Sequence, residues 1–187
     1  SGSAVSLGNV SEALQPPSRQ DGNHTLANNT IADTGAEYAG CAGIFAGYVA
    51  FTTISHNDVT NTSNGAVCLG WGWGAKNSMR SNRMTANRIT RSNTVLYDCG
   101  SVYTLSAQPD SEVAYNYIAD QVMLFGSLPV QNLQRTFMHR IPARLLHSVV
   151  YECSPLPRLA LPFISITGTT TPTRRSSTRT TTSSSGA

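Results

Sequence analysis

One pattern of apolar and polar positions occurs four times along the chain. Each copy has an apolar residue, two variable positions, an asparagine, one variable position and a second apolar residue, and the copies read LANNTI, ISHNDV, MTANRI and VAYNYI. The asparagines are Asn29, Asn57, Asn87 and Asn116, at spacings of 28, 30 and 29 residues. Because a nearly constant spacing of this size is typical of repeat architectures, we expect one structural unit per copy.

A second motif alternates with the first along the chain. It reads AVSLG, GIFAG, AVCLG and SVYTL, with the aliphatic positions Val5, Ile44, Val67 and Val102. These positions are 39, 23 and 35 residues apart, so their spacing is much less even. One part of each unit therefore has a fixed length while another accepts insertions, which in repeat proteins often lie on the working face.

Short strands in units of this size predict an all-β fold, a parallel β-helix of about four coils. Coils stack at the strand spacing of about 4.8 Å, so that equivalent aliphatic side chains form columns in the interior. Asparagine suits a recurrent turn because it tolerates left-handed backbone geometry and its amide can bond the asparagine of the next coil. A β-sandwich with asparagine-rich turns is the alternative, but it does not explain why the asparagine keeps the same neighbours four times.

The repeat predicts three regions. Residues 1–125 form the partial β-helix, residues 126–166 are irregular, and residues 167–187 form a disordered tail rich in Ser, Thr and Arg. The tail is either a mucin-like linker or the product of a reading-frame change, since threonine codons read one base earlier encode Asn, Asp, His or Tyr. We favour the frame change, which makes the chain a fragment. We expect an uncapped last coil, which favours self-association, and the apolar segment 159–166 is a candidate to cover it.

Composition and charge narrow the range of partners. Only 12% of the residues are charged and the formal net charge is +3. The cluster of Arg80, Arg83, Arg88 and Arg91 has no interleaved aromatic residues, so we interpret it as a solvated face and expect no nucleic-acid partner. No apolar run approaches membrane-spanning length, which predicts no membrane partner.

Secretion is indicated only indirectly. The chain lacks an initiator Met and a signal peptide, so its N-terminus is interpreted as a cut edge. Glycosylation sequons begin at Asn9, Asn23, Asn28 and Asn61 and give weak support for secretion, because such triplets are frequent in a chain rich in Asn and Thr.

Five segments resemble a known group of proteins. They read IADTGAEYAGCAGIFAGY, TTISHNDV, GAVCLGWGWG, LYDCGSVYTLSAQP and YNYIAD. They resemble the right-handed parallel β-helix proteins of the pectin-lyase-like superfamily and, more narrowly, secreted carbohydrate-active proteins of the glycoside hydrolase family 141 type. The resemblance implies a right-handed helix, an extracellular location, and a polysaccharide bound along the first sheet and the loop that precedes it. It also implies that the Asn turn joins the second and third sheets.

Strand alternation assigns the faces of the first sheet. The aliphatic positions of the second motif point inward, and the residues that follow them point outward along the groove. The outward residues are Ser6, Phe45, Cys68 and Tyr103.

Candidate catalytic groups are few. Hydrolysis of a glycosidic bond uses two carboxyl groups, one on each side of that bond. Asp98 matches the acidic position that the family implies, and Glu37 occupies the corresponding loop of an earlier coil; the alternatives are a turn-capping aspartate and a solvent-exposed loop acid. The family also implies a Tyr-x-Asp-Glu-Gly motif one coil further on, where the chain instead reads VMLFGSLPVQNLQRTF. If that motif supplies the second carboxyl group, the chain as given is incomplete as an enzyme.

Other chemistry is less favoured. A lyase needs a base and a cation, but the chain has a single lysine, Lys76, and no clustered calcium ligands. His24 and His56 lie beside the Asn turns and are expected to be structural or solvent-facing. The cysteines show no CxxC spacing, so we expect free thiols, no metal and no cofactor. Cys41 and Cys99 occupy equivalent positions two coils apart, about 9.6 Å, too far for a disulfide. Four residues share one offset from the ladder asparagines, which indicates turn chemistry: Asp33, Asn61, Arg91 and Asp120.

Aromatic residues are the candidate sugar contacts. Trp71 and Trp73 alternate with glycines directly after the AVCLG strand, and Gly70 and Gly72 permit a bend. We therefore expect Trp73 on the rim of the groove and Trp71 packed at the end of the strand. The other candidate contacts are Phe45, Tyr38, Tyr97 and Tyr103. The chain is thus interpreted as part of a secreted polysaccharide hydrolase; the alternative is a non-catalytic β-helix remnant or a carbohydrate-binding scaffold.

Overall fold

The computed structural model describes residues 2–96, 99–125, 128–132, 136–137, 148–152 and 163–166. The tail 167–187 and the candidate residues Tyr97 and Asp98 lie outside the described residues.

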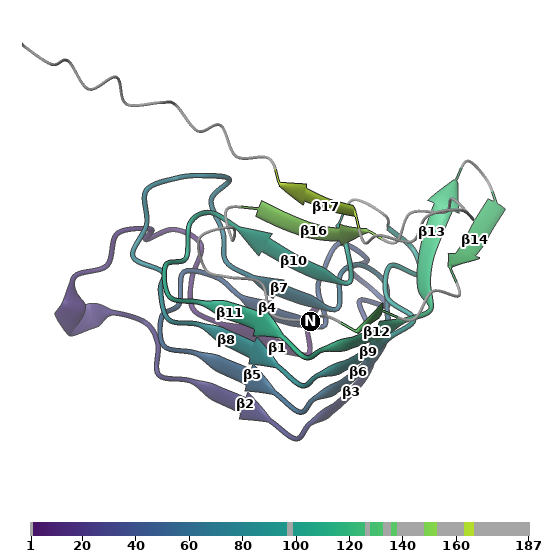
Figure 1. Ribbon diagram of the computed structural model, residues 1–187, viewed down its shortest axis with the longest axis horizontal. Coiled ribbons are helices and arrows are strands. Elements are labelled where there is room, and N and C mark those ends of the chain that lie inside the picture. The colour runs from purple at the N-terminus through teal and green to yellow at the C-terminus, as the bar shows by residue number, and fades with distance from the viewer. Residues whose placement is uncertain are drawn as a thin grey trace, which may run out of the picture.

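Three sheets of stacked parallel strands form the body of the molecule (Figure 1). The first contains β1 (Val5–Leu7), β4 (Ile44–Ala46), β7 (Val67–Leu69) and β10 (Val102–Leu105). The second contains β2 (Thr25–Ala27), β5 (Thr53–Ser55), β8 (Arg83–Thr85) and β11 (Glu112–Ala114). The third contains β3 (Thr30–Thr34), β6 (Asp58–Thr62), β9 (Arg88–Thr90) and β12 (Tyr117–Ala119). Each coil gives one strand to each sheet, so the predicted parallel β-helix of four coils is confirmed; its described helical part is the short 3₁₀ turn η1 (Pro17–Arg19).

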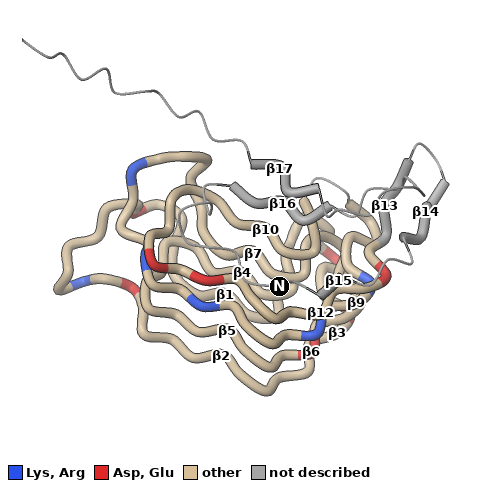
Figure 2. The backbone as a smooth tube through the Cα atoms, in the orientation of Figure 1, with Lys and Arg blue, Asp and Glu red and all other residues tan. Residues whose placement is uncertain are grey.

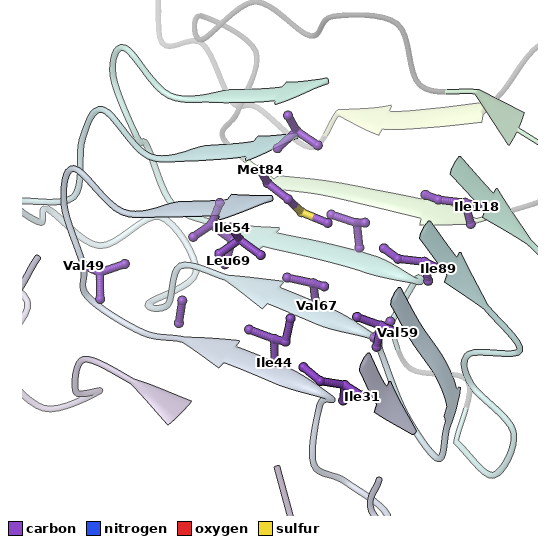
Figure 3. Packing of buried hydrophobic residues seen from close by; sticks show 14 residues of the cluster. Ile31, Ile44, Val49, Ile54, Val59, Val67, Leu69, Met84, Ile89 and Ile118 are labelled. Atoms are coloured by element: carbon purple, nitrogen blue, oxygen red, sulfur yellow. The ribbon is translucent and has the colours of Figure 1, made fainter. Parts of the chain in front are cut away.

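The register of the first sheet follows the second sequence motif. Val5 pairs with Ile44, Ile44 with Val67, and Val67 with Val102. The last three of these side chains are fully buried, whereas the residues that follow them in each strand face outward. Figure 3 shows how buried aliphatic side chains from the three sheets meet in the interior. Columns of equivalent side chains fill the narrow coil, which is why the core contains Ile, Val, Leu, Met and Ala and no buried tryptophan.

The four asparagines form the expected ladder between the second and third sheets. The Asn57 side-chain amide donates to Asn87 Oδ1 over 3.0 Å, and that of Asn87 donates to Asn116 Oδ1 over 2.9 Å. Asn29 donates to Asn57 in the same way over 2.9 Å. One part of the expectation is wrong: the left-handed residue is the one before the ladder asparagine. Its φ is between 54° and 59° in all four coils, at Asn28, His56, Ala86 and Tyr115.

Left-handed residues recur at two further corners of each coil. These corners lie five residues before and five residues after the left-handed residue that precedes the ladder asparagine. The earlier corner is made by Asn23, Phe51, Ser81 and Asp110. The later corner is made by Asp33, Asn61, Arg91 and Asp120. The turn role expected for these last four residues is therefore confirmed. The residue after each corner points inward and, from the second coil onward, is buried and polar, as with Thr52, Asn82 and Ser92.

The strands described after the fourth coil form antiparallel pairs with one another or with the repeat. They are β13 (Gln121–Phe125), β14 (Leu128–Asn132), β15 (Thr136–Phe137), β16 (Ser148–Glu152) and β17 (Phe163–Ile166). β16 pairs with β10 and β15 pairs with β12. The expectation of an uncapped last coil is thus wrong for the first and third sheets; in the second, β11 is the last described strand. β17, from the segment expected to cover this end, pairs with β16 and extends the first sheet.

Charged residues are sparse along the coils (Figure 2). Arg88 on β9 forms an ion pair with Asp58 on β6, with its Nη1 2.9 and 3.0 Å from the two carboxylate oxygens. Arg80 lies over the ring of Phe51, 5.1 Å from its centroid. Within the part of the chain that the structure describes, no helix has the length and apolarity to cross a membrane.

Candidate functional site

Three aromatic rings form a continuous series beside the first sheet. Phe45 projects outward from β4 and meets the edge of Trp71, with ring centroids 5.6 Å apart and planes inclined at 75°. Trp71 in turn meets Trp73 at 4.7 Å and 68°. Trp71 is half-buried, whereas Trp73 is 65% exposed. We call Phe45, Trp71 and Trp73 the aromatic series.

The backbone after β7 turns because its glycines adopt conformations that other residues avoid. Gly70, Gly72 and Gly74 have φ values of 104°, 101° and 90°. Trp73 lies between two of them with φ of 44°, in the left-handed region that is costly for a bulky side chain. A hydrogen bond from Ala75 N to Gly72 O, 2.9 Å long, closes the turn. The chain therefore bends at Gly70, directly after β7. Trp71 and Trp73 do not point inward, as they would if the strand continued straight.

Strand pairing places further outward-facing residues of the first sheet beside Phe45. Phe45 is paired with Cys68, and Cys68 with Tyr103. Neighbouring strands are about 4.8 Å apart, so these three side chains lie in one row across three coils. Tyr103 is half-buried there. Its role as a sugar contact stays a prediction.

The loops that lead into the first sheet meet at the corner before its strands, at the opposite ends of those strands from Trp71 and Trp73, which follow β7. Glu37 and Tyr38 are both exposed in the connection between β3 and β4, Tyr38 by 62%. Asn64, in the next connection, donates from Nδ2 to Gly40 O over 3.0 Å and accepts from Cys99 Sγ at Oδ1 over 2.7 Å. The loop that carries Glu37 is thereby linked to the residue that follows Asp98 in sequence. Asp98 and Tyr97 themselves lie outside the described residues.

A thiol pair lies beneath this corner. Within the described residues, no disulfide joins Cys41, Cys68 or Cys99. Hydrogen bonding to Cys99, together with burial and the proximity of the Cys99 charge, raises the pKa of Cys68 well above its ordinary value. Gly65 N donates to Cys99 Sγ over 3.1 Å. Cys68 therefore stays a neutral thiol at neutral pH, which suits packing rather than nucleophilic chemistry.

The remaining candidates lie apart from the aromatic series. His24 Nε2 is 2.8 Å from Asp21 Oδ1 near the start of β2, and His56 is exposed at the turn between the second and third sheets. No group of three or more His, Cys, Asp or Glu side chains among the described residues is placed to hold a metal ion.

Sequence reasoning missed the residues that hold the aromatic turn. Gln108, only 2% exposed, donates from Nε2 to Leu69 O over 2.8 Å and accepts from Asn82 Nδ2 over 3.0 Å. The signal that was available is positional: Asn82 precedes its ladder asparagine by five residues, as do His24, Thr52 and Ser111. Their side chains differ, so a search for identical residues does not find this row.

Comparisons of the chain with protein-family models, with curated proteins and with solved structures each found no match. The class of protein that the fold defines is the parallel β-helix. Its function has to be argued from the site itself.

Proposed function

We propose that this chain recognises a polysaccharide along the outward face of its first sheet, with the aromatic series as the principal contact. The supporting observation is Trp73, a large ring that is 65% exposed and held in a left-handed backbone conformation. Such strain persists only where the surrounding structure imposes it, and strained residues cluster at functional sites. The sequence resemblance to pectin-lyase-like, family 141-type proteins supports the same proposal.

The chemistry of the face suits sugars better than an apolar protein partner. A sugar ring presents C–H faces that pack on aromatic rings and hydroxyl edges that need hydrogen-bonding groups. Hydrogen-bonding groups without charge are plentiful in this chain. Only 12% of its residues are charged, and Asn, Ser and Thr supply most of its polarity. The row across three coils also fits an extended ligand. An extracellular location, where such polymers occur, belongs to the same proposal.

Replacing Trp73 by asparagine is expected to weaken polysaccharide binding about tenfold, because one aromatic contact contributes on the order of 1.4 kcal/mol. Asparagine tolerates a left-handed backbone, so the variant is expected to keep the melting temperature of the parent. The measurement is affinity electrophoresis against a panel of neutral and acidic polysaccharides.

Tyr115→Asn is the matched control for Trp73→Asn. Tyr115 is also 65% exposed and has φ of 57°, but it lies at the corner between the second and third sheets. Its substitution is expected to leave binding unchanged. Equal behaviour of the two variants, or a parent chain that no polysaccharide retards, would contradict the proposal.

A second candidate function is hydrolysis of the bound polysaccharide, with Asp98 and Glu37 as the carboxyl groups. It is favoured by the contacts through Asn64, which connect the Glu37 loop with Cys99, the residue next to Asp98. Two carboxyl groups on either side of one bond are the usual requirement for this chemistry.

Asp98→Asn is expected to abolish the release of reducing ends from the polysaccharides that the parent retains, while binding persists. Asp110→Asn is the control, because Asp110 is an exposed acid at a left-handed corner and should be dispensable. A parent chain that binds polysaccharide without releasing sugar would contradict the hydrolysis proposal and support recognition alone. Unchanged release by Asp98→Asn would remove the assignment of Asp98.

A further inference from the structure

We propose that Ser106 is a positioning residue whose hydroxyl group fixes the aromatic turn, residues 70–74, so that Trp73 is presented outward beside Trp71. The consequence for binding rests on the proposed function, whereas the positioning itself is a property of the free protein.

The aromatic turn is attached to the coils on both sides of it. At its start, Gly70 N donates to Ala46 O of the preceding coil over 2.7 Å. At its end, Gly74 N donates to Ser106 Oγ of the following coil over 2.9 Å. Ser106 is fully buried and itself left-handed, with φ of 62°, so its hydroxyl group has a fixed position. The turn is therefore held between two neighbouring coils.

The middle of the turn rests on hydroxyl groups. A Cβ atom placed on Gly72 would lie 2.5 Å from Tyr48 Oη and 3.3 Å from Ser106 Oγ. Tyr48 is buried, with 5% of its surface exposed. A side chain at Gly72 would thus overlap Tyr48 Oη and be in tight contact with Ser106 Oγ. Ser106 contributes both to this support and to the hydrogen bond at the end of the turn.

The end of the turn has little other support. A Cβ atom on Gly74 would meet nothing within 4 Å, so this residue lies in open surroundings. Glycine has access to many backbone conformations, and the left-handed conformation of Trp73 is unfavourable in isolation. The stabilisation from one hydrogen bond is similar in size to the cost of one left-handed residue. Loss of the Ser106 hydroxyl group therefore allows other conformations of the turn to be populated.

The test uses the coupling between the two indoles, which lie 4.7 Å apart and are inclined at 68°. Such a pair produces an exciton couplet in the far-ultraviolet circular dichroism spectrum of the free protein, and Trp73→Asn supplies the spectrum without it. Ser106→Ala is expected to reduce the couplet by half or more and to weaken polysaccharide retention three- to tenfold. Ser106→Gly is expected to do the same, although glycine favours the left-handed backbone, which separates loss of the hydroxyl group from backbone strain.

Ser111→Ala is the matched control. Ser111 is buried, 3% exposed, and its Oγ accepts from Asn82 N over 2.9 Å, a bond of the same kind between two residues outside the aromatic turn. This variant is expected to lower the melting temperature like Ser106→Ala but to keep the couplet. An intact couplet in both Ser106 variants, or an equal loss in Ser111→Ala, would overturn the inference. If the Ser106 variants lose the couplet but the parent binds no polysaccharide, the positioning role is supported and the proposed function is contradicted. If the parent binds polysaccharide but the Ser106 variants keep the couplet, only the positioning role is contradicted.

Discussion

Replacing Asn87 by alanine is expected to lower the free energy of unfolding by about 3–5 kcal/mol, because leaving each buried polar group without a partner costs about 1–3 kcal/mol. Asn87 Oδ1 accepts from both the backbone N and the side-chain Nδ2 of Asn57, each over 3.0 Å. Its own Nδ2 donates to Ile54 O over 3.0 Å and to Asn116 Oδ1 over 2.9 Å. Alanine removes all four bonds from a side chain that is 1% exposed, where water cannot replace them.

The position of Asn87 inside the ladder gives this prediction its control. Asn29 occupies the first coil and is only half-buried; its side chain donates to Asn57 Oδ1 over 2.9 Å and to Ala27 O over 3.0 Å. Asn29→Ala is therefore expected to cost about 1 kcal/mol. Urea unfolding followed by circular dichroism measures both variants. Equal losses would mean that the ladder contributes through the propensity of its turns and not through its buried hydrogen bonds.

Gly70→Ala is expected to destabilise the protein by about 2–4 kcal/mol, because it combines an unfavourable φ with steric overlap. The new Cβ atom would lie 2.5 Å from Leu105 O and 2.4 Å from Gln108 Nε2. The first is a backbone atom of the neighbouring coil, and the second belongs to a buried amide already bonded to Leu69 O over 2.8 Å. Neither can move without disturbing the start of the aromatic turn, so binding is expected to fall together with stability.

Gly74→Ala isolates the contribution of the backbone conformation. Gly74 has φ of 90°, close to the 104° of Gly70, but an added Cβ atom there meets nothing within 4 Å. Its substitution is expected to cost about 1 kcal/mol, from backbone strain alone. The melting temperatures of both variants give the comparison. A loss at Gly74 as large as that at Gly70 would show that contact with Gln108 and Leu105 does not limit the turn.

The fold was predictable where the same residues recur, and less so where only the geometry recurs. The ladder and the register of Val5, Ile44, Val67 and Val102 follow directly from repeated motifs. The corner before Asn87 was misplaced by one residue, because the left-handed positions hold residues as different as Asn28 and Tyr115. At these positions the stacked coils impose the conformation and override local preference. The antiparallel pairing of β16 with β10 has no repeat to indicate it.

The candidate site was predictable only in part, for a related reason. Strand parity and the glycines indicate where the chain bends at Trp71 and Trp73, since these signals are local. The contact between Gly74 and Ser106 joins positions 32 residues apart, across loops of unequal length, so no local pattern reveals it. The roles of Tyr38, Tyr103 and Glu37 in binding or catalysis remain predictions from the resemblance.

The corners also determine where this architecture tolerates change in length. Because a single left-handed residue makes each corner, the two strands on either side of the ladder keep a fixed separation in every coil. Variation in length therefore falls in the connections on both sides of the first sheet. The connections that follow its strands are residues 8–24, 47–52, 70–82 and 106–111, and they range from 6 to 17 residues in length. A lineage carrying this fold can thus lengthen or replace the segments that border the proposed binding face without altering the ladder.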